Sequence, residues 1–358
     1  MADTDDEKLE QEEQRQVAVI IGASSGIGMA TALEFAKHDY DVVLAARRKK
    51  ELDDVAKQCR DEGVEALVVP TDITDDKAVH ALAEAAIQQF HHIDIWVNDA
   101  GVYITGKFED VPLEDMHRLF DTNFFGYVHG SHAALTEFRR AGHGTLINIS
   151  SVNATAPMPF TGVYGASKAA VRALDESLRM ELRVDGLQDD IHVCTVMPAT
   201  VDTNVFQNAA NYTGKEVEAI APVYEPGYVA KQIVGLARKP KREIIIGPAG
   251  KLMAMQRAYM PGSYEKRMSQ YVKQQLLGDG PATMTDGNLF EPLEDHTGMH
   301  GGWRARKMRA DHLNAGLGIG LGLAAAIAAG VGIAMAKREK REPTVVERSH
   351  GLFHAIFS

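Results

Sequence analysis

The sequence predicts an α/β fold, a Rossmann-like doubly wound parallel sheet with helices on both faces, plus a C-terminal helical extension. Apolar runs typical of buried strands alternate with helical stretches from residue 17 to residue 250. A glycine-rich turn joins the first run to the first helix. The 358 residues, 45% of them apolar, suffice for one large α/β core and an extension.

Seven apolar runs rich in β-branched residues are the predicted strands. They cover residues 17–21, 41–46, 66–70, 93–98, 144–150, 191–197 and 243–246. The predicted helices lie between them, at 27–38, 49–62, 75–91, 112–140, 161–184 and 227–238. Ligands of such sheets bind beyond the carboxyl ends of the strands. We therefore expect the site around the residues that follow those ends, Gly22, Asn98, Ser151 and Pro198.

The first predicted strand runs directly into a turn with glycines at positions 22, 26 and 28. Glycine permits a tight turn and lets the backbone approach a pyrophosphate closely. The helix that follows offers its N-terminal N–H groups and its dipole to that anion. The pattern Gly-x-x-x-Gly-x-Gly by itself also fits an ordinary strand-to-helix turn.

Tyr164 and Lys168 are four residues apart in a predicted helix, so they share one face. A phenol has a pKa near 10, and a neighbouring ammonium favours its ionised form. This spacing predicts a tyrosine prepared for proton transfer. Its plain alternative is a surface helix with a partly buried tyrosine.

Over residues 16–250 the chain resembles the short-chain dehydrogenase/reductase family in its ordinary single-domain form. Five elements in the family's order carry the resemblance. They are the glycines Gly22, Gly26 and Gly28, the turn Asn98-Asp99-Ala100-Gly101, Asn123, Ser151 with Tyr164 and Lys168, and Met197-Pro198 through Thr203.

The resemblance implies four catalytic side chains, Asn123, Ser151, Tyr164 and Lys168. Tyr164 would donate a proton to a carbonyl oxygen as hydride reaches the carbon, or accept one in the reverse direction. Lys168 would lower the pKa of Tyr164 and bind the nicotinamide ribose, and Asn123 would hold a water for proton relay to Lys168. Ser151 would hold the substrate oxygen, because strand alternation turns Ser150 to the other side.

The end of the second strand indicates NADP(H) as the cofactor. An acid there binds the ribose 2′-hydroxyl of NAD and repels a 2′-phosphate. Here Ala46 stands where NAD-preferring relatives have Asp, and Arg47 and Arg48 follow with guanidinium groups that suit a phosphate. A solvated charge run, continued by Lys49 and Lys50, is the alternative.

Asp72 ends the third strand and resembles the acid that contacts the adenine amino group. Its alternative role is a helix N-cap, although Thr74 is expected to supply that cap. Val201 and Thr203 match positions that contact the nicotinamide carboxamide. The cofactor contacts implied by the resemblance are Gly22, Ser24, Ser25, Gly26, Ile27, Gly28, Arg47, Arg48, Asp72, Ile73, Asn98, Ala100, Gly101, Tyr164, Lys168, Pro198, Val201 and Thr203.

Three residues depart from the family pattern without removing a catalytic group. Ile21 replaces a threonine before the first glycine, and Ala199 replaces a glycine after Pro198. Asp99 stands where a second asparagine is usual, which keeps an acceptor and loses a donor. Each departure is expected to shift affinity modestly.

The substrate is expected to be a small molecule, a hydrophobic ketone or secondary alcohol. Residues 206–224 occupy the place of the family's substrate-covering loop and carry Phe206, Tyr212 and Ile220. Met158 and Phe160 would line the same cleft, or all of these residues would be ordinary core. The alternative function is a catalytically silent, nucleotide-binding relative that acts as a regulator or membrane scaffold.

Composition limits the other possibilities. The net charge is −11, and residues 1–16, with seven acids and two bases, form a predicted disordered acidic tail. This balance argues against nucleic-acid binding. Neither the two cysteines nor the scattered histidines form a metal-ligand pattern, so no metal site is predicted. The absence of a secretory signal and the cofactor requirement favour a cytoplasmic catalytic domain, which we expect to form a homo-oligomer.

The chain beyond the catalytic domain, residues 17–250, has four predicted parts. Residues 251–277 form basic amphipathic helices, which lie on a membrane surface or pack on a partner subunit. Residues 278–312 form a linker. Residues 313–336 carry no charge and are long enough to span a membrane or associate with it, or they form a glycine-rich tail packed on the enzyme. Residues 337–358 are a basic tail.

Overall fold

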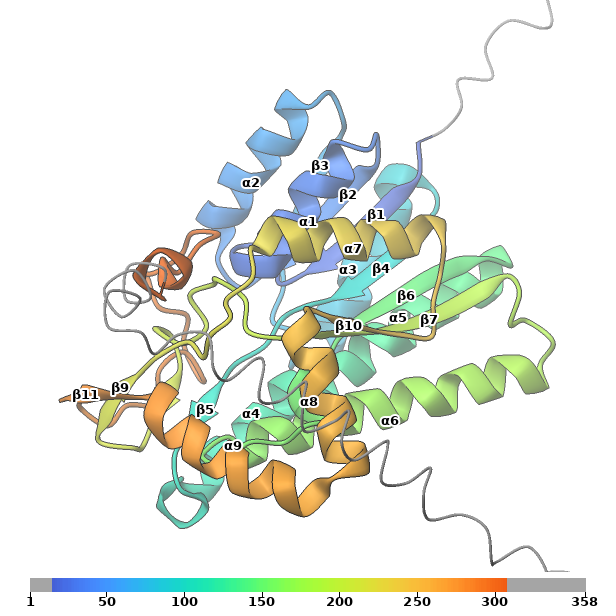
Figure 1. The fold of residues 1–358 in the computed structure, drawn as a ribbon. Helices are drawn as coiled ribbons and strands as arrows, with labels where there is room; N and C mark the ends of the chain where they lie inside the picture. The colour runs from blue at the N-terminus through green and yellow to red at the C-terminus, as the bar shows by residue number, and fades with distance from the viewer. Residues whose placement is uncertain (1–14, 308–358) are drawn as a thin grey trace, which may run out of the picture. The chain divides into compact units, whose positions relative to one another are not determined.

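The computed structural model describes residues 15–307 and contains a seven-stranded parallel sheet (Figure 1). The strand order is β10-β7-β6-β4-β1-β2-β3, with the reversal between β1 and β4. The strands are β1 (Val17–Ile21), β2 (Asp41–Ala46), β3 (Ala66–Pro70), β4 (Ile95–Asn98), β6 (Gly144–Ile149), β7 (Ile191–Pro198) and β10 (Glu243–Ile246). The predicted fold class is confirmed.

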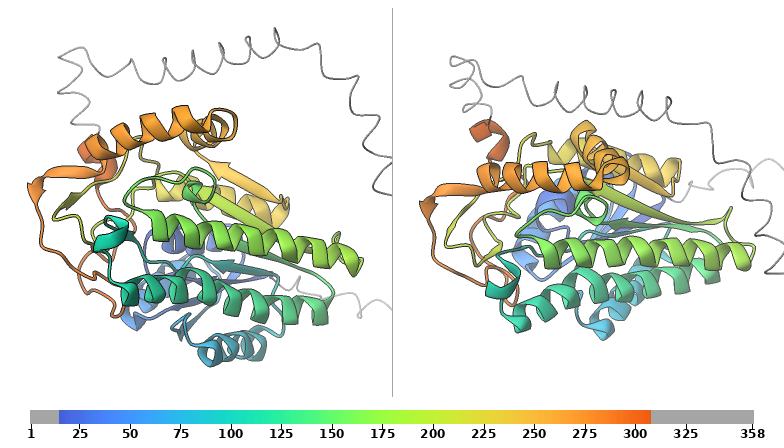
Figure 2. Two further views of the ribbon diagram at one scale, coloured as in Figure 1. Left: turned by 90° about the horizontal axis from the view of Figure 1, so that it is seen from below. Right: turned by 60° about the horizontal axis from the view of Figure 1, so that its bottom comes forward.

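Helices cover both faces of this sheet (Figure 2). One face carries α1 (Gly26–Ala36), α2 (Lys49–Asp61) and α7 (Pro226–Arg238). The other face carries α3 (Asp76–Phe90), α5 (Gly126–Ala141) and α6 (Gly162–Val184). Since parallel strands need crossover connections, each helix between two strands is directed to one of these faces.

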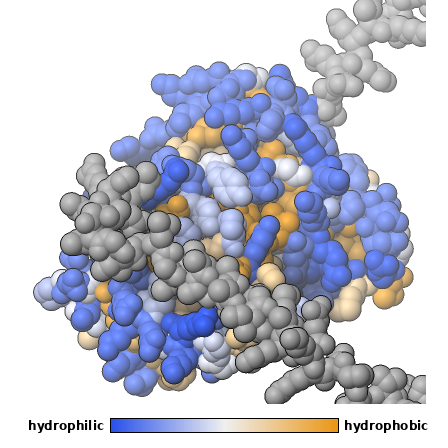
Figure 3. All heavy atoms as spheres, viewed as in Figure 1, coloured by the Kyte–Doolittle hydropathy of each residue, from blue (hydrophilic) through white to orange (hydrophobic). Residues whose placement is uncertain are grey.

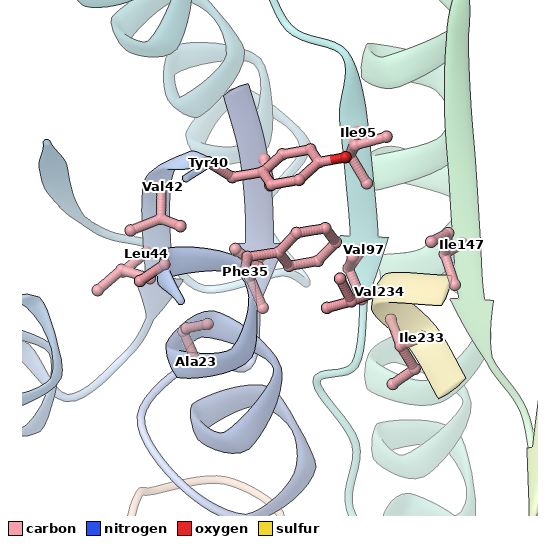
Figure 4. Close-up of a cluster of buried hydrophobic side chains, with 14 of the residues drawn as sticks. Ala23, Phe35, Tyr40, Val42, Leu44, Ile95, Val97, Ile147, Ile233 and Val234 are labelled. Atoms are coloured by element: carbon pink, nitrogen blue, oxygen red, sulfur yellow. The ribbon is translucent and has the colours of Figure 1, made fainter. Parts of the chain in front are cut away.

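The hydrophobic core divides into two clusters because successive strand residues point to opposite faces. Ile95 and Val97 belong to the cluster under α1 and α7, whereas Trp96 belongs to the other cluster. Figure 4 shows the first cluster, where Phe35 of α1 lies beside Val97 and near Val234 of α7. Burying such side chains fixes the sheet and thereby the position of its carboxyl edge.

Two helix boundaries differ from the prediction for local reasons. The helix α3 is capped by Asp75, whose carboxylate accepts hydrogen bonds from the N–H groups of Lys77 and Ala78. Thr74, the predicted cap, instead donates from its N–H and hydroxyl to Asp72. The predicted helix 112–140 is α4 (Leu113–Phe120) and α5 joined by one π-helical turn at Asp121–Phe125. Such turns occur frequently at functional sites.

The basic helices after the sheet pack on the rest of the domain. They are α8 (Pro248–Tyr259) and α9 (Pro261–Gln275). Tyr264, Met268, Val272 and Leu276, spaced four apart along α9 and just after it, are buried in a cluster with Ile220. The apolar side of α9 is therefore covered within the chain, whereas the prediction placed it on a membrane or on a partner subunit.

The predicted linker 278–312 is largely ordered against the domain. It begins within β11 (Leu277–Pro281), which pairs with β9 (Lys215–Val217). A second small pair joins β5 (Ile104–Thr105) and β8 (Ala210–Asn211). Leu289 and Trp303 are apolar side chains within this polar segment, and both are buried against the domain. We call residues 286–304 the strap.

The predicted acidic tail lies outside the described residues except for its last two positions. The charge-free segment 313–336 and the basic tail 337–358 lie wholly outside them. Between residues 15 and 307, no helix combines the length and the hydrophobicity needed to cross a membrane. On the face drawn in Figure 3, hydrophilic side chains cover most of the described surface.

Candidate active site

A cleft opens at the carboxyl ends of the central strands. Seventeen of the predicted site residues line it: Gly22, Ser24, Ser25, Gly26, Ile27, Arg47, Arg48, Asp72, Ile73, Ala100, Gly101, Ser151, Tyr164, Lys168, Pro198, Val201 and Thr203. Gly28, Asn98 and Asn123 are not part of its lining and lie behind it. The fold thus gathers nearly the whole predicted set in one place.

The turn between β1 and α1 has space for a backbone and for no side chain. Gly22 has a φ of +98°, and a Cβ there would lie 2.7 Å from the nitrogen of Ala100. A Cβ on Gly28 would lie 2.2 Å from the carbonyl oxygen of Gly22. Gly28 therefore allows α1 to pack against the turn. The resulting cradle fits the diphosphate of a dinucleotide.

Two of the first N–H groups of α1 already donate hydrogen bonds within the protein. The N–H of Gly26 donates to the carbonyl of Gly298, 3.4 Å away, and that of Gly28 donates to the Asp99 carboxylate. Within the described residues, the N–H of Ile27 has no such partner. It is the group that this helix terminus offers to an anion.

Arg47 and Arg48 stand at the outer end of the cleft, past β2. Arg47 donates to the carbonyl oxygens of Phe290, at 2.8 Å, and Asn288, at 3.1 Å. Arg48 donates to the carbonyl of Leu293 and to the Ser24 hydroxyl. Neither guanidinium has a carboxylate ion-pair partner in the described part of the chain, and burial lowers the pKa of each.

A third arginine, Arg118 of α4, lies near Arg47. The sequence did not reveal this proximity. Arg118 lies 3.5 Å from the Asp72 carboxylate and donates to the carbonyl of Leu289. Asp72 also accepts two hydrogen bonds from Thr74, and the pKa of Asp72 is lowered although burial opposes this. Asp72 therefore stays ionised beside the guanidinium groups of Arg118 and Arg47.

Tyr164 and Ser151 form the centre of the inner end. Burial raises the pKa of the Tyr164 phenol to about 12, although its hydrogen bond with Ser151 lowers it. Ser151 also accepts from the N–H of Asn153 at 3.2 Å, which orients its hydroxyl. Ser150 also lines the cleft, but its hydroxyl donates to the carbonyl of Lys168 at 2.8 Å.

Lys168 is held by two hydrogen bonds within the protein. Its Nζ donates to the carbonyl of Ile149, at 2.9 Å, and to the hydroxyl of Tyr127, at 3.1 Å. Burial lowers the pKa of Lys168 to about 8, and the Asp99 carboxylate opposes this change. The pKa of Tyr164 is raised and not lowered as expected, because burial of the phenol outweighs the other influences on it.

Asp99 is the acid that interacts electrostatically with this lysine. Burial raises the pKa of its carboxyl to about 7, while Lys168 and the N–H of Gly28 counteract the rise. The departure noted at position 99 therefore places an ionisable group where the family has an amide. Its charge state is coupled to that of Lys168.

Two asparagines support the cleft from behind. Asn123, in the π-helical turn, accepts from the N–H of Val102 and donates to its carbonyl, both at 2.9 Å. This paired contact fixes the loop after β4. Asn98 accepts from Trp96 and donates to Asn148 within a buried network. Both side chains hold the backbone that forms the cleft wall.

A row of aromatic rings leads from Tyr164 to the strap. The ring of Tyr103 meets that of Tyr164 edge-on, with centroids 4.5 Å apart. Phe206 contacts Tyr103, and Trp303 contacts Phe206. The sequence indicated Phe206 as a residue near the site, but it did not indicate Tyr103, Tyr127 or Trp303. Only the position of Tyr103 directly after Gly101-Val102 offered a signal.

Comparisons with known proteins agree with this geometry. A family model described as short chain dehydrogenase matches residues 16–213. An uncharacterized oxidoreductase of Bacillus subtilis, YxnA, is 34% identical over 287 residues, which cover 80% of each chain. The dehydrogenase/reductase SDR family member 7B of Bos taurus is 29% identical, over 72% of this chain and 82% of that protein.

Two solved structures are similar in fold and sequence. An alcohol dehydrogenase from the archaeon Thermococcus sibiricus, complexed with 5-hydroxy-NADP, has a TM-score of 0.57 and 25% identity, covering 65% of this chain and 96% of its own. A short-chain dehydrogenase from Streptomyces avermitilis has a TM-score of 0.61 and 26% identity, covering 70% of this chain and 95% of its own.

Proposed function

The chain belongs to the short chain dehydrogenase family and is an oxidoreductase of that family, and we propose that it interconverts a hydrophobic ketone and its secondary alcohol with NADP(H). The observation that carries this proposal is the position of Tyr164, partly buried in the cleft and hydrogen-bonded to Ser151. A bound nicotinamide cofactor supplies or accepts the hydride. The protein's side chains handle the proton and the orientation of the substrate.

Tyr164 is the acid in the reducing direction. With a pKa raised to about 12 it keeps its proton at neutral pH, ready to donate it to a developing alkoxide. Ser151 donates a hydrogen bond to the same oxygen and fixes the carbonyl beside the phenol. In the oxidising direction the same phenolic oxygen takes the proton of the alcohol.

Lys168 and Asp99 act behind this tyrosine. A Cβ at Gly101 would lie 3.7 Å from the Lys168 Nζ, so the ammonium group borders the cleft. A positive charge there favours a partly ionised phenol during proton transfer. The Asp99 carboxylate keeps Lys168 protonated to a higher pH than burial alone would permit.

The preference for a hydrophobic substrate rests on the walls near Tyr164. Tyr103 lines the cleft, and its ring contacts those of Tyr164 and Phe206. Met158 and Phe160 pack against the cluster formed by α9 and Ile220. Apolar walls with a few polar groups are typical of sites for small hydrophobic ligands.

The preference for NADP(H) rests on the outer end of the cleft. Arg47 and Arg48 use four N–H groups for backbone carbonyls and the Ser24 hydroxyl, which leaves further N–H donors on each guanidinium. No acid stands at the end of β2, since Ala46 is its last residue. The Thermococcus sibiricus relative was solved with an NADP derivative, which supports this choice.

The test is a direct assay of the purified protein with NADPH and with NADH against a panel of hydrophobic ketones. We expect oxidation of NADPH with at least one ketone and a higher kcat/KM than with NADH. Binding of NADPH without turnover of any ketone or alcohol would favour the silent regulator instead. Failure to bind either cofactor would contradict the proposal.

A further inference from the structure

The strap crosses the outer end of the cleft and is held there by arginines. Three successive carbonyls, those of residues 288, 289 and 290, accept hydrogen bonds from Arg47 or Arg118. The carbonyl of Leu293 accepts from Arg48. A backbone bound in this way by charged donors is a fixed part of the site wall, because such hydrogen bonds are stronger than neutral ones.

The strap continues along the cleft toward its inner end. The carbonyl of Gly298 accepts from the side chain of Asn204 at 2.8 Å. Further on, the indole of Trp303 donates to the carbonyl of Thr203 and to Gln207. These contacts tie the strap to the loop after β7, which carries the predicted nicotinamide contacts.

Two asparagines on these segments have an amide oxygen that is buried without a hydrogen-bond partner. Asn208, which is 7% exposed, and Asn288 of the strap both line the cleft. The Oδ1 atom of each is buried and unsatisfied. The amide nitrogen of Asn208 donates to the carbonyl of His296, which orients the amide group. The two residues are joined by a hydrogen bond of 3.0 Å between the N–H of Asn288 and the carbonyl of Asn208.

A buried acceptor without a partner is unfavourable, so its presence in a cleft indicates a donor on the ligand. Arg47, which binds the Asn288 carbonyl, places this pair at the end of the cleft assigned to the adenosine half. That half of a dinucleotide carries N–H and O–H donors on adenine and ribose. The nicotinamide ring instead lies near Tyr164.

We propose that the strap is a component of the cofactor site and that Asn208 and Asn288 accept hydrogen bonds from the adenosine half of the cofactor. This inference rests on the proposed function. It extends the cofactor site beyond the segment that the family model matches, residues 16–213, since Asn288 lies well outside it. A region of the chain unrelated to the Rossmann core thereby helps to select the ligand.

The test compares the affinities of the full-length protein for NADPH, ADP-ribose and nicotinamide mononucleotide by calorimetry. The variants are Asn208→Leu and Asn288→Leu, which remove the acceptor at similar side-chain volume. We expect each to bind NADPH and ADP-ribose about 3- to 10-fold more weakly, with affinity for nicotinamide mononucleotide unchanged. Glu265→Gln, an exposed change on α9 outside the strap, is the matched control.

Asn208→Asp keeps an acceptor at the buried position and distinguishes loss of the hydrogen bond from loss of folding. We expect ADP-ribose binding to be restored toward the wild-type value relative to Asn208→Leu. Unchanged affinities in both leucine variants, or equal losses for the two half-ligands, would overturn the inference alone. A wild-type protein that binds neither NADPH nor ADP-ribose would overturn the proposed function as well.

Discussion

The indole nitrogen of Trp303 donates a hydrogen bond of 3.1 Å to the carbonyl oxygen of Thr203. Thr203 lies in the loop after strand β7, whereas Trp303 lies a hundred residues further along the chain, near the end of the strap. The backbone N–H of Trp303 also donates to the Asp202 carboxylate, at 2.7 Å. The strap is thus joined to the cleft wall at this point by both backbone and side chain.

Trp303→Ala should therefore destabilise the protein. Trp303 is 4% exposed and packs on Phe206, and removal of a buried aromatic side chain typically lowers the free energy of unfolding by about 3–5 kcal/mol. Urea unfolding measures this change. Met284→Ala, at a residue 60% exposed, is the control and should stay within about 0.5 kcal/mol of wild type. An equally small effect at Trp303 would show that the strap is not part of the folded unit.

Tyr164→Phe should lower kcat by about 10²- to 10⁴-fold, because a positioned acid contributes that much. NADPH affinity should stay close to wild type, since only the phenolic hydroxyl is lost. Steady-state kinetics and a binding titration separate the two effects. Tyr103→Phe is the matched control, because it keeps the ring that contacts Tyr164. Activity of Tyr164→Phe within a few-fold of wild type would exclude Tyr164 as the acid.

Arg47→Ala should weaken NADPH binding about 10- to 100-fold and NADH binding much less, since a hydrogen bond to a charged group is stronger than a neutral one. Ala46→Asp should shift the preference toward NADH by repelling a 2′-phosphate. The dissociation constants of both cofactors are to be measured for each variant. Lys49→Ala, which removes an exposed partner of Asp53, serves as control. Equal losses for NADPH and NADH would contradict a role in 2′-phosphate recognition.

Asp99→Asn should stabilise the protein more at about pH 8 than at about pH 5. Burial raises the pKa of Asp99 from 3.8 to about 7, so between these values the folded state binds more protons than the unfolded state. The free energy of unfolding therefore falls as the pH rises through this window. The difference between the two pH values is at most about 3 kcal/mol, because pH 5 lies about two units below the raised pKa of about 7 and one pKa unit corresponds to about 1.4 kcal/mol.

Thermal unfolding at the two pH values measures this difference. Asn keeps an acceptor for the N–H of Gly28, so the turn should be preserved. Asp53→Asn at the exposed surface is the control and should give the same small change at both pH values. A stabilisation by Asp99→Asn that is independent of pH would mean that Asp99 does not titrate in this range.

The charge-free segment 313–336 still predicts membrane attachment through the C-terminus. Full-length protein should sediment with membranes and resist a high-salt wash, whereas a chain ending at Asp311 should be released and remain active. Cell fractionation with salt and alkaline washes is the measurement. Full-length protein found entirely in the supernatant would contradict an anchor, and release by salt alone would point to the basic helices α8 and α9.

The sequence by itself determined the features that depend on neighbours along the chain. The buried strand at Val17–Ile21 and the glycines after it are a local pattern, and so is the four-residue spacing of Tyr164 and Lys168. Strand alternation distinguished Ser151 from Ser150, because successive side chains point to opposite sides. Periodicity and turn chemistry act over a few residues, so they can be read without a structure.

Only the tertiary structure decided which distant residues meet at the site. Arg47 is 243 residues from Phe290, whose carbonyl it binds, and nothing in the composition of the strap predicts that contact. The pKa of Tyr164 depends on burial by several elements, so the neighbouring Lys168 did not predict its direction. Such effects are sums over contacts between segments remote in sequence, and those contacts leave no periodic signal in the chain.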